Sequence, residues 1–287
     1  MSENQELNQN SPLISVIVAT RNSGRVLSRC IDSFCSQTFK EKEMLIVDGA
    51  STDDTLKIIK QNENKLAFWM SEPDKGIYDA WNKLISHAKG DWLYFIGSDD
   101  WFYDRNVLEV AAPHLARAYP QYKVVYGSIA NVTEKGEIVE IIGKPWEKVS
   151  KRFQHEMTIP HQGVFHHRTL FQTKGLFDPS FKICGDYELL LRELKTSPAL
   201  FIPDLVLTAM QFGGVSATLS HVPLIIEELE RARKQNNLDF FSFPLFARKV
   251  RAKMRRRIQS ILGNKMANLI ADAYRVLSGK PRIWTRK

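Results

Sequence analysis

Aspartates follow two apolar stretches of the sequence. Asp99 and Asp100 stand together in YFIGSDDWF (residues 94–102), and Asp48 and Asp54 follow an earlier apolar run. Adjacent carboxylates repel each other, and such a cluster is costly unless a cation or hydrogen bonds compensate it. A hard divalent cation such as Mg2+ takes one or two carboxylates together with substrate phosphates. The aspartates therefore indicate a metal and phosphate site, with helix capping and a solvated turn as the alternative interpretation.

The first hundred residues alternate between short apolar runs and amphipathic segments. The runs LISVIVAT, EMLIVDG, LAFWMSE and DWLYFIG are typical of strands, and the segments between them carry apolar residues at helical spacing. Short strand-to-helix connections predict an α/β fold with a mostly parallel sheet and helices on both faces. Ligands of such sheets bind beyond the carboxyl ends of the strands. This predicts that three loops meet at one edge: residues 20–22, 48–54 and 98–100.

The second half of the chain is less regular. A hairpin is predicted for KVVYGSIANV and GEIVEIIGK, one or more strands for IPHQGVFHH and ALFIPDLVLTAMQF, and helices for CGDYELLLRELK and PLIIEELERARKQ. Beyond these, apolar residues recur every three or four positions and predict a long helix with one apolar stripe. The stripe consists of Phe243, Phe246, Val250, Met254, Ile258 and Ile261 or Leu262.

Charge is unevenly distributed. The chain carries a net charge of +8, and residues 247–287 contain thirteen Lys or Arg against one acid, Asp272. This tail is therefore +12, which leaves −4 for the rest and points to an anionic partner of the tail. The first residues lack the features of a secretory signal, and no apolar run approaches the ~18 residues of a spanning helix. Three cysteines without a CxxC pair fit a reduced, cytoplasmic compartment.

Several common motifs are absent. The loop glycines match neither GxGxxG nor GxxxxGK[ST], so phosphate binding of the dinucleotide or P-loop kind is not indicated. No HExxH or other compact His/Cys spacing occurs, and His166-His167 lies in an apolar context that favours a structural role over zinc binding.

Five segments, in order, resemble glycosyltransferase family 2. They are PLISVIVATRN, LIVDGASTDDT, WMSEPDKGIYDAWNKLISHAKGDWLYFIGSDD, HQGVFHH and FDPSFKICGDYELLLREL, and they extend over about seven-tenths of the chain. The nearest type is that of bacterial polysaccharide, O-antigen and lipopolysaccharide biosynthesis. The resemblance implies a GT-A fold at residues 13–220, after a disordered tail (1–12) and before a basic helical extension (221–287).

The resemblance also implies roles for individual residues. Asp100 matches the metal ligand, for Mn2+ or Mg2+, and Asp186 matches the catalytic base of inverting members. Two further candidates come from the residues themselves: His161, at the start of a predicted strand, as an acceptor or diphosphate contact, and residues 213–216, with paired glycines, as a mobile loop near the diphosphate. The remaining residues match positions that bind the nucleotide sugar: Thr20, Asn22, Asp48, Asp54, Asp74, Lys75 and Asp99. Relatives often carry two consecutive acids where this chain has Asp48-Gly49, so one base contact is missing or replaced.

The expected chemistry follows from these roles. A nucleoside diphosphate leaves the anomeric carbon of a sugar, a metal held by Asp100 stabilises its charge, and Asp186 takes the proton of the attacking acceptor hydroxyl. The implied partners are a nucleoside-diphosphate sugar, with UDP favoured over GDP, and a saccharide acceptor linked to a lipid. The predicted location is the inner face of the cell membrane, as a peripheral protein.

Alternatives remain for the tail and for the function. The basic helix is expected to lie on an anionic membrane surface. Packing on the catalytic domain or on a second subunit is the alternative, and nucleic-acid binding is disfavoured because no known module is present. Two other functions are a nucleotide-sugar-binding protein without catalysis, which would not need Asp186, and a nucleotidyltransferase, for which TRNSGR is a poor Gly-rich basic loop.

Overall fold

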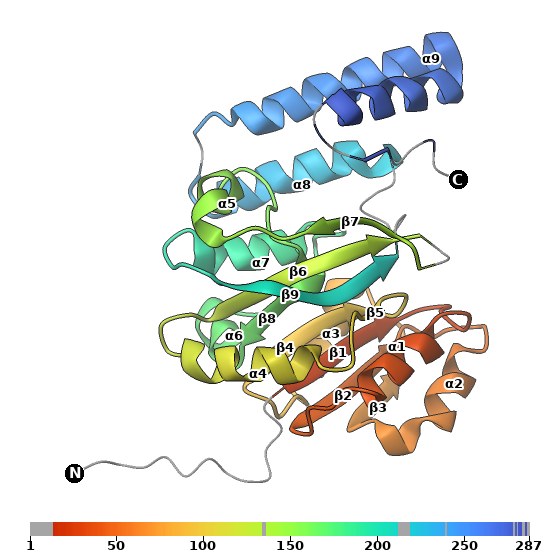
Figure 1. Ribbon diagram of the computed structural model, residues 1–287, viewed down its shortest axis with the longest axis vertical. Coiled ribbons are helices and arrows are strands. Elements are labelled where there is room, and N and C mark those ends of the chain that lie inside the picture. The colour runs from red at the N-terminus through yellow and green to blue at the C-terminus, as the bar shows by residue number, and fades with distance from the viewer. Residues whose placement is uncertain are drawn as a thin grey trace.

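Figure 1 shows the computed structural model of the chain, which describes residues 14–133, 136–211, 219–238, 240–277, 279, 281–282 and 285. The predicted disordered tail (1–12) and the predicted mobile loop (213–216) lie outside the described residues.

The first half of the chain forms a parallel sheet with intervening helices, as predicted. The strands lie in the order β3-β2-β1-β4, and all three pairings among them are parallel. The strands are β1 (Ile14–Thr20), β2 (Lys42–Asp48), β3 (Phe68–Ser71) and β4 (Trp92–Gly97), and the helices are α1 (Leu27–Cys35), α2 (Thr55–Gln61) and α3 (Ile77–Ile85).

The second half extends this sheet beyond β4 with strands of mixed direction. The order continues β8-β6-β9-β5, with β7 also paired to β6, and only β6 and β9 run parallel among these described strands. The predicted β6–β7 hairpin is confirmed, and residues 200–211 form one strand. The bounds are β5 (Trp101–Phe102), β6 (Val124–Val132), β7 (Ile138–Ile142), β8 (Val164–His167) and β9 (Leu200–Gln211).

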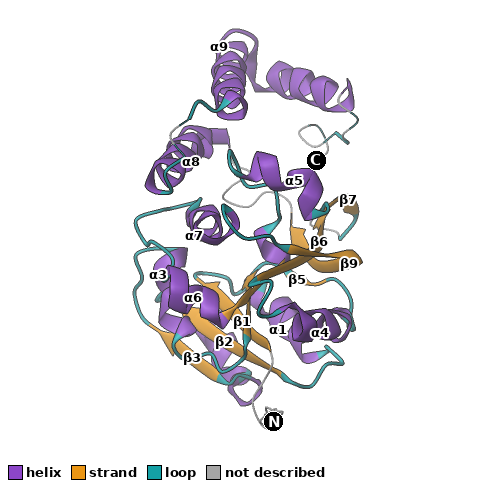
Figure 2. Ribbon diagram, turned by 90° about the vertical axis from the view of Figure 1, so that its left-hand side faces the viewer, coloured by secondary structure: helices purple, strands orange, loops and turns teal. Residues whose placement is uncertain are grey.

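Both faces of the sheet are covered by helices. Successive residues of β1 alternate between two cores, with Ile17 in one and Val16 and Val18 in the other. This explains why residues of both alternating sets are mostly apolar in the strand. Helices α3, α6 (Arg168–Lys174) and α7 (Gly185–Leu194) pack on one face, and α1, α2 and α4 (Val107–Ala118) pack on the other. Figure 2 shows the two layers from the edge, with α3, α6 and α7 on one side and α1 and α4 on the other. Helix α5 (Trp146–Phe153) joins the first of these cores.

Two helices follow the sheet. Helix α8 (Val222–Gln235) packs on α7 through Ile225 and Leu229, which are part of the same core. Helix α9 (Phe243–Leu277) has a kink at Gly263, whose φ of 76° is favourable for glycine. The two limbs of α9 contact each other, since Arg255 donates a hydrogen bond to the side chain of Asn268 (Figure 1). The helix predicted beyond residue 243 is thus confirmed, with a bend at the end of its apolar stripe.

A buried carboxylate joins α8 to the segment that precedes α7. Glu228 is 3% exposed, and its two oxygens accept hydrogen bonds from the backbone N–H groups of Lys182 (2.6 Å), Ile183 (2.9 Å) and Cys184 (2.8 Å). A charged acceptor satisfies three consecutive backbone donors in this way. The interaction fixes the chain immediately before Gly185 and Asp186.

We predict that Glu228→Ala lowers the free energy of unfolding by about 3 kcal/mol, because three shielded N–H groups would lose their acceptor. Urea unfolding followed by circular dichroism measures this change. The matched control is Glu227→Ala on the exposed side of α8, which should change stability by less than about 0.5 kcal/mol. Equal stabilities of the two variants would contradict the structural role of Glu228.

Candidate active site

The three loops predicted to share one edge of the sheet are joined by hydrogen bonds. The backbone N–H of Asn22 donates to Ser51 Oγ (2.8 Å), and Asn22 Oδ1 accepts from the N–H of Thr52 (2.9 Å). Ser23 Oγ lies 2.9 Å from Ser98 Oγ. The loops after β1, β2 and β4 therefore form one continuous surface, and the amide oxygen of Asn22 helps to hold it together.

Asp48 is buried beneath this surface. Its carboxylate accepts hydrogen bonds from the N–H of Ser51 (3.0 Å), from the Ser51 hydroxyl and from Ser71 Oγ (2.7 Å). The side chain thus ties the end of β2 to β3. In this arrangement Asp48 shapes the edge from below and is shielded from solvent.

Asp53 makes the loop contacts at the start of α2. Its Oδ2 accepts from the N–H of Gly24 (3.0 Å), and its Oδ1 accepts from the N–H of Thr55 (3.0 Å) and from the Thr55 hydroxyl. These hydrogen bonds, with that of Thr55 Oγ1 the largest cause, lower the pKa of Asp53. Asp54 is exposed and makes no capping hydrogen bond with its side chain. The sequence prediction named Asp54 and missed Asp53, although an Asp two residues before a helix-starting Thr signals an Asx-type turn.

Asp74 covers the glycine that follows Asp48. Its Oδ1 accepts from the N–H of Gly76 (2.8 Å), and a Cβ added at Gly49 would lie only 2.3 Å from its Oδ2. The carboxylate of Asp74 thus occupies the space into which a second acid at position 49 would extend. Lys75 is exposed, and Thr20 at the end of β1 has a buried hydroxyl without a hydrogen-bond partner among the described residues.

A cavity of about 790 Å³ lies at the carboxyl edge of the sheet, beyond β4 and next to α7. Four of the predicted residues line it, namely Asp99, Asp100, His161 and Asp186. The other six (Thr20, Asn22, Asp48, Asp54, Asp74 and Lys75) are not part of its lining and lie at the ends of β1 and β2 or in the connections after β1, β2 and β3. The structure therefore separates the predicted residues into a group around the cavity and a group along the neighbouring part of the edge.

The carboxylates of Asp99 and Asp100 lie close together at the cavity. A Cβ at Gly97 would lie 2.8 Å from Asp99 Oδ1 and 2.8 Å from Asp100 Oδ2, so both oxygens face the same small space. Burial and the charge of Asp99 raise the pKa of Asp100 to about 8. A divalent cation would offset the burial of Asp100 and its repulsion by Asp99. Two carboxylates suit a cation that completes its coordination with phosphate oxygens. No group of three or more His, Cys, Asp or Glu side chains suited to a metal occurs in the described ranges.

Arg29 and Gln211, which no sequence pattern indicated, support the Asp99–Asp100 loop. The guanidinium of Arg29 donates to the backbone carbonyl of Asp99 (2.9 Å) and lies 3.6 Å from the ring centre of Trp101. The N–H of Gln211 donates to Asp100 Oδ1 (3.3 Å). Trp101 therefore acts through Arg29 to hold the loop.

Asp186, in the first turn of α7, is held through one oxygen. Its Oδ1 accepts from the N–H of Tyr187 (2.8 Å) and lies 3.2 Å from the hydroxyl of Tyr78, which also reaches the backbone carbonyl of Ile183 (2.6 Å). This leaves Oδ2 for another partner. Burial raises the pKa of Asp186 to about 6, although these hydrogen bonds oppose the shift. Gly185 allows the close approach, because a Cβ there would lie 2.7 Å from the Tyr78 ring. A carboxyl group with this pKa is suited to proton transfer near neutral pH.

His161 lies in the cavity wall as a neutral ring. Burial lowers its pKa to about 3, and its Nε2 has no hydrogen-bond partner in the described part of the chain. The ring packs against Trp81, with 5.2 Å between ring centres. His161 can offer one hydrogen bond to a ligand, but it brings no positive charge to a diphosphate.

Comparisons with known proteins agree on one family. The model of Glycosyl transferase family 2 matches residues 15–174. A PGL/p-HBAD biosynthesis glycosyltransferase of Mycobacterium bovis is 31% identical over 217 residues, which cover 73% of this chain and 81% of that protein. An uncharacterized glycosyltransferase of Rickettsia typhi is 28% identical over 201 residues, which cover 68% of this chain and 62% of that protein.

Solved structures show the same fold at low sequence identity. The S. aureus protein TarS (residues 1–349), in complex with UDP-GlcNAc, has a TM-score of 0.59 at 16% identity, with 89% of this chain and 83% of that chain covered. The mannosyltransferase PcManGT of Pyrobaculum calidifontis, in complex with GDP-Man and Mn2+, has a TM-score of 0.60 at 18% identity, with 92% and 76% covered. The predicted GT-A fold is thereby confirmed. The family match and the 31% identity to a glycosyltransferase establish that the chain belongs to glycosyl transferase family 2.

Proposed function

We propose that this glycosyltransferase is inverting and metal-dependent, and that it moves a hexosyl or N-acetylhexosaminyl group from a nucleoside-diphosphate sugar to a saccharide hydroxyl. One observation carries the proposal: a single cavity contains Asp186, with a pKa raised to about 6, and the Asp99–Asp100 pair. The first can accept a proton, and the second can anchor a diphosphate through a cation. These are the two requirements of sugar transfer in one step.

Asp186 serves as the general base in this proposal. The acceptor hydroxyl donates a hydrogen bond to Asp186 Oδ2, and the carboxylate takes the proton as the oxygen attacks the anomeric carbon. Tyr78 and the N–H of Tyr187 keep Oδ1 in place during this step. Attack from the side opposite the leaving diphosphate inverts the anomeric centre.

The donor diphosphate belongs at the other group of acids. Asp100, with Asp99 beside it, would hold Mn2+ or Mg2+, and the ion would supply charge stabilisation to the leaving diphosphate. Structures of related fold were solved with UDP-GlcNAc and with GDP-Man and Mn2+, which supports a nucleotide sugar as donor. We favour UDP over GDP and assign the nucleotide to the loops that contain Thr20, Asn22, Asp48, Asp54, Asp74, Lys75 and Asp99.

The role of Asp186 is tested by Asp186→Asn. The turnover number should fall by about 10²- to 10⁴-fold while donor affinity stays the same, because the variant cannot accept the proton. In the unaltered enzyme, the turnover number should rise as pH increases through about 6 and then level off, since the ionised carboxylate is the active form. The residual activity of the variant should lack this step.

Product formation is measured by release of nucleoside diphosphate across a panel of nucleotide sugars and saccharide acceptors. Near-normal turnover of Asp186→Asn would remove Asp186 as base. Donor binding without any transfer in the unaltered protein would favour a binding protein, and release of pyrophosphate would favour a nucleotidyltransferase.

The metal proposal predicts a second result. UDP with Mn2+ should raise the midpoint of thermal unfolding by several degrees, because ligand binding stabilises the folded state by mass action. Asp100→Asn should lose the part of this increase that requires Mn2+. The control is Asp91→Asn, an exposed residue at the opposite end of β4. Stabilisation by UDP that survives exhaustive chelation would contradict the metal requirement.

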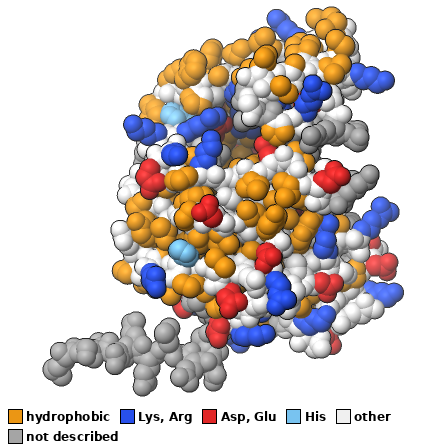
Figure 3. Space-filling view, viewed as in Figure 1, with side chains coloured by type: hydrophobic (Ala, Val, Ile, Leu, Met, Phe, Trp, Pro, Cys, Tyr) orange, Lys and Arg blue, Asp and Glu red, His pale blue; other side chains and the backbone are white. Residues whose placement is uncertain are grey.

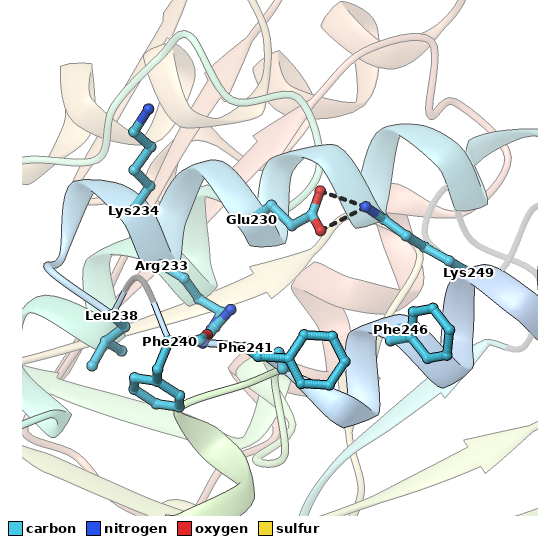
Figure 4. Close-up of a pocket in the computed structure, with 9 residues that line it drawn as sticks. Glu230, Arg233, Lys234, Leu238, Phe240, Phe241, Phe246 and Lys249 are labelled. Atoms are coloured by element: carbon cyan, nitrogen blue, oxygen red, sulfur yellow. Dashed lines mark hydrogen bonds and ion pairs between the residues drawn. The ribbon is translucent and has the colours of Figure 1, made fainter.

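The C-terminal helices support a proposal about location. No helix of the described chain combines the length and apolar character that crossing a bilayer requires. Most of the apolar stripe of α9 faces solvent, however, and Phe243 at its start is 70% exposed. Phe241, just before the helix, is 72% exposed. We define the aromatic patch as Phe240, Phe241, Phe243 and Phe246, and Figure 4 shows three of its rings, Phe240, Phe241 and Phe246, with Phe246 beside Lys249.

Exposed aromatic and aliphatic side chains among cations are typical of a helix that lies in the membrane interface. Figure 3 shows hydrophobic side chains over the α9 end of the molecule, with Lys and Arg side chains between them. The groove next to the aromatic patch is about 310 Å³ and contains Arg233, Lys234 and Lys249 as well as Glu230. We propose that this end of the protein lies on the anionic inner face of the cell membrane, where a lipid-linked acceptor is available.

The membrane proposal predicts that the protein floats with anionic vesicles and does so less at high salt. The double substitution Phe241→Ser and Phe243→Ser should abolish flotation, as should deletion of the residues after Phe246. Val110→Ser is the matched control, because Val110 is also exposed but lies on α4. Unchanged flotation of the double variant would contradict a role of the aromatic patch, and equal flotation with neutral vesicles would contradict the role of charge.

A further inference from the structure

The start of α9 contributes to two different surfaces. Lys249 forms an ion pair with Glu230 (2.7 Å) at the groove beside the aromatic patch, as Figure 4 shows. Its neighbour Arg248 instead lines the cavity that contains Asp186. Lys182, which lies four residues before Asp186, is another cation in the lining of this cavity. The two cations at the cavity therefore come from α9 and from the segment held by Glu228.

Neither Arg248 nor Lys182 is neutralised by a carboxylate of its own. Arg248 Nη1 lies 3.6 Å from Glu156 Oε2, whereas Arg152 approaches Glu156 Oε1 more closely, at 2.6 Å through Nε and 2.5 Å through Nη2. One carboxylate is thus shared between two guanidinium groups. Lys182 Nζ donates to the backbone carbonyl of Lys75 (3.2 Å) and forms no ion pair within the described segments. Positive charge therefore remains available at the cavity.

This charge lies on the side of the base. Burial raises the pKa of the Cys184 thiol, and Arg248 is the cation that opposes this shift. The corresponding cation at Asp100 is Arg29. The cavity lining thus has Asp99 and Asp100 at one position, and Asp186, Cys184 and Arg248 at another. In the proposed function the donor diphosphate binds at Asp99 and Asp100. The cations near Asp186 therefore suit a different anion.

We propose that Arg248 and Lys182 bind a phosphate group of the acceptor, namely the phosphate or diphosphate that links its sugar to a lipid. The proposal rests on the proposed function, since it specifies the acceptor class of the same site. A guanidinium group binds phosphate oxygens through two parallel hydrogen bonds, and an ammonium group adds a point charge. The acceptor sugar would reach Asp186, its phosphate would lie between Arg248 and Lys182, and its lipid would extend towards the aromatic patch.

The test uses a short, water-soluble lipid diphosphate and no vesicles. Binding of geranyl diphosphate to the full chain is measured by calorimetry, with UDP and Mn2+ present at saturation so that the donor site is filled. Geraniol, which has no phosphate, shows the contribution of the hydrocarbon alone. The unaltered protein should bind geranyl diphosphate and not geraniol. Arg248→Ala and Lys182→Ala should each weaken this binding by at least tenfold, and Arg248→Lys should restore only part of it.

The matched control is Arg251→Ala, an exposed cation on the same helix outside the cavity lining, which should leave binding unchanged. UDP affinity should be equal in all variants, which also shows that each variant is folded. Unweakened binding in both Arg248→Ala and Lys182→Ala would overturn the proposal, as would an equal loss in Arg251→Ala. A loss of flotation with anionic vesicles, without any loss of geranyl diphosphate binding, would assign Arg248 to phospholipid headgroups and would also overturn it.

The test separates this inference from the proposed function. One outcome is normal release of UDP from a UDP-sugar together with unchanged geranyl diphosphate binding in the variants. It would contradict the proposed acceptor phosphate site and leave the proposed transferase function standing. The opposite outcome is specific geranyl diphosphate binding in a protein that turns over no nucleotide sugar. It would contradict the proposed reaction and leave the phosphate site standing.

Discussion

The hydrogen bonds from three backbone N–H groups to Glu228 fix the segment on which the candidate base depends. Residues 182–184 belong to the connection between α6 and α7, and Asp186 follows them after Gly185. The charge of Glu228 also contributes to raising the pKa of Asp186, after burial as the main cause. One buried carboxylate on α8 thus affects both the position of Asp186 and its affinity for a proton.

The location of Glu228 bears on how the chain is organised. The family match ends at residue 174, whereas Asp186 and Glu228 lie beyond it. The matched region contains the parallel strands, the Asp99–Asp100 pair and the loops assigned to the nucleotide. The proposed base and the cations near it come from the later part of the chain, and α8 and the start of α9 form part of the cavity wall. The C-terminal helices are therefore part of the cavity wall as well as the surface that we propose for membrane binding.

Much of this arrangement could be predicted from local patterns. The apolar runs identified β1 to β4, and the topology of a parallel sheet placed the loops that contain Asn22, Ser51 and Ser98 at one edge. The contacts that complete the site could not be predicted, because they join residues far apart in sequence. Tyr78 and Asp186 are 108 positions apart, and Gln211 and Asp100 are 111 apart, so no periodic signal connects them. Which of Asp53 and Asp54 makes the loop hydrogen bonds depends on the local turn, because the turn points the two adjacent carboxylates in different directions.

The close spacing of Phe246 and Arg248 has a consequence for substrate length. Two residues of helix correspond to a rise of roughly 3 Å, and the first side chain belongs to the proposed membrane surface while the second lines the cavity. A protein that binds the bilayer in this way would hold its cavity at a constant, small height above the headgroups. It would then reach sugars close to the lipid and miss those at the far end of a long glycan, so it would add its sugar early in the assembly of a chain.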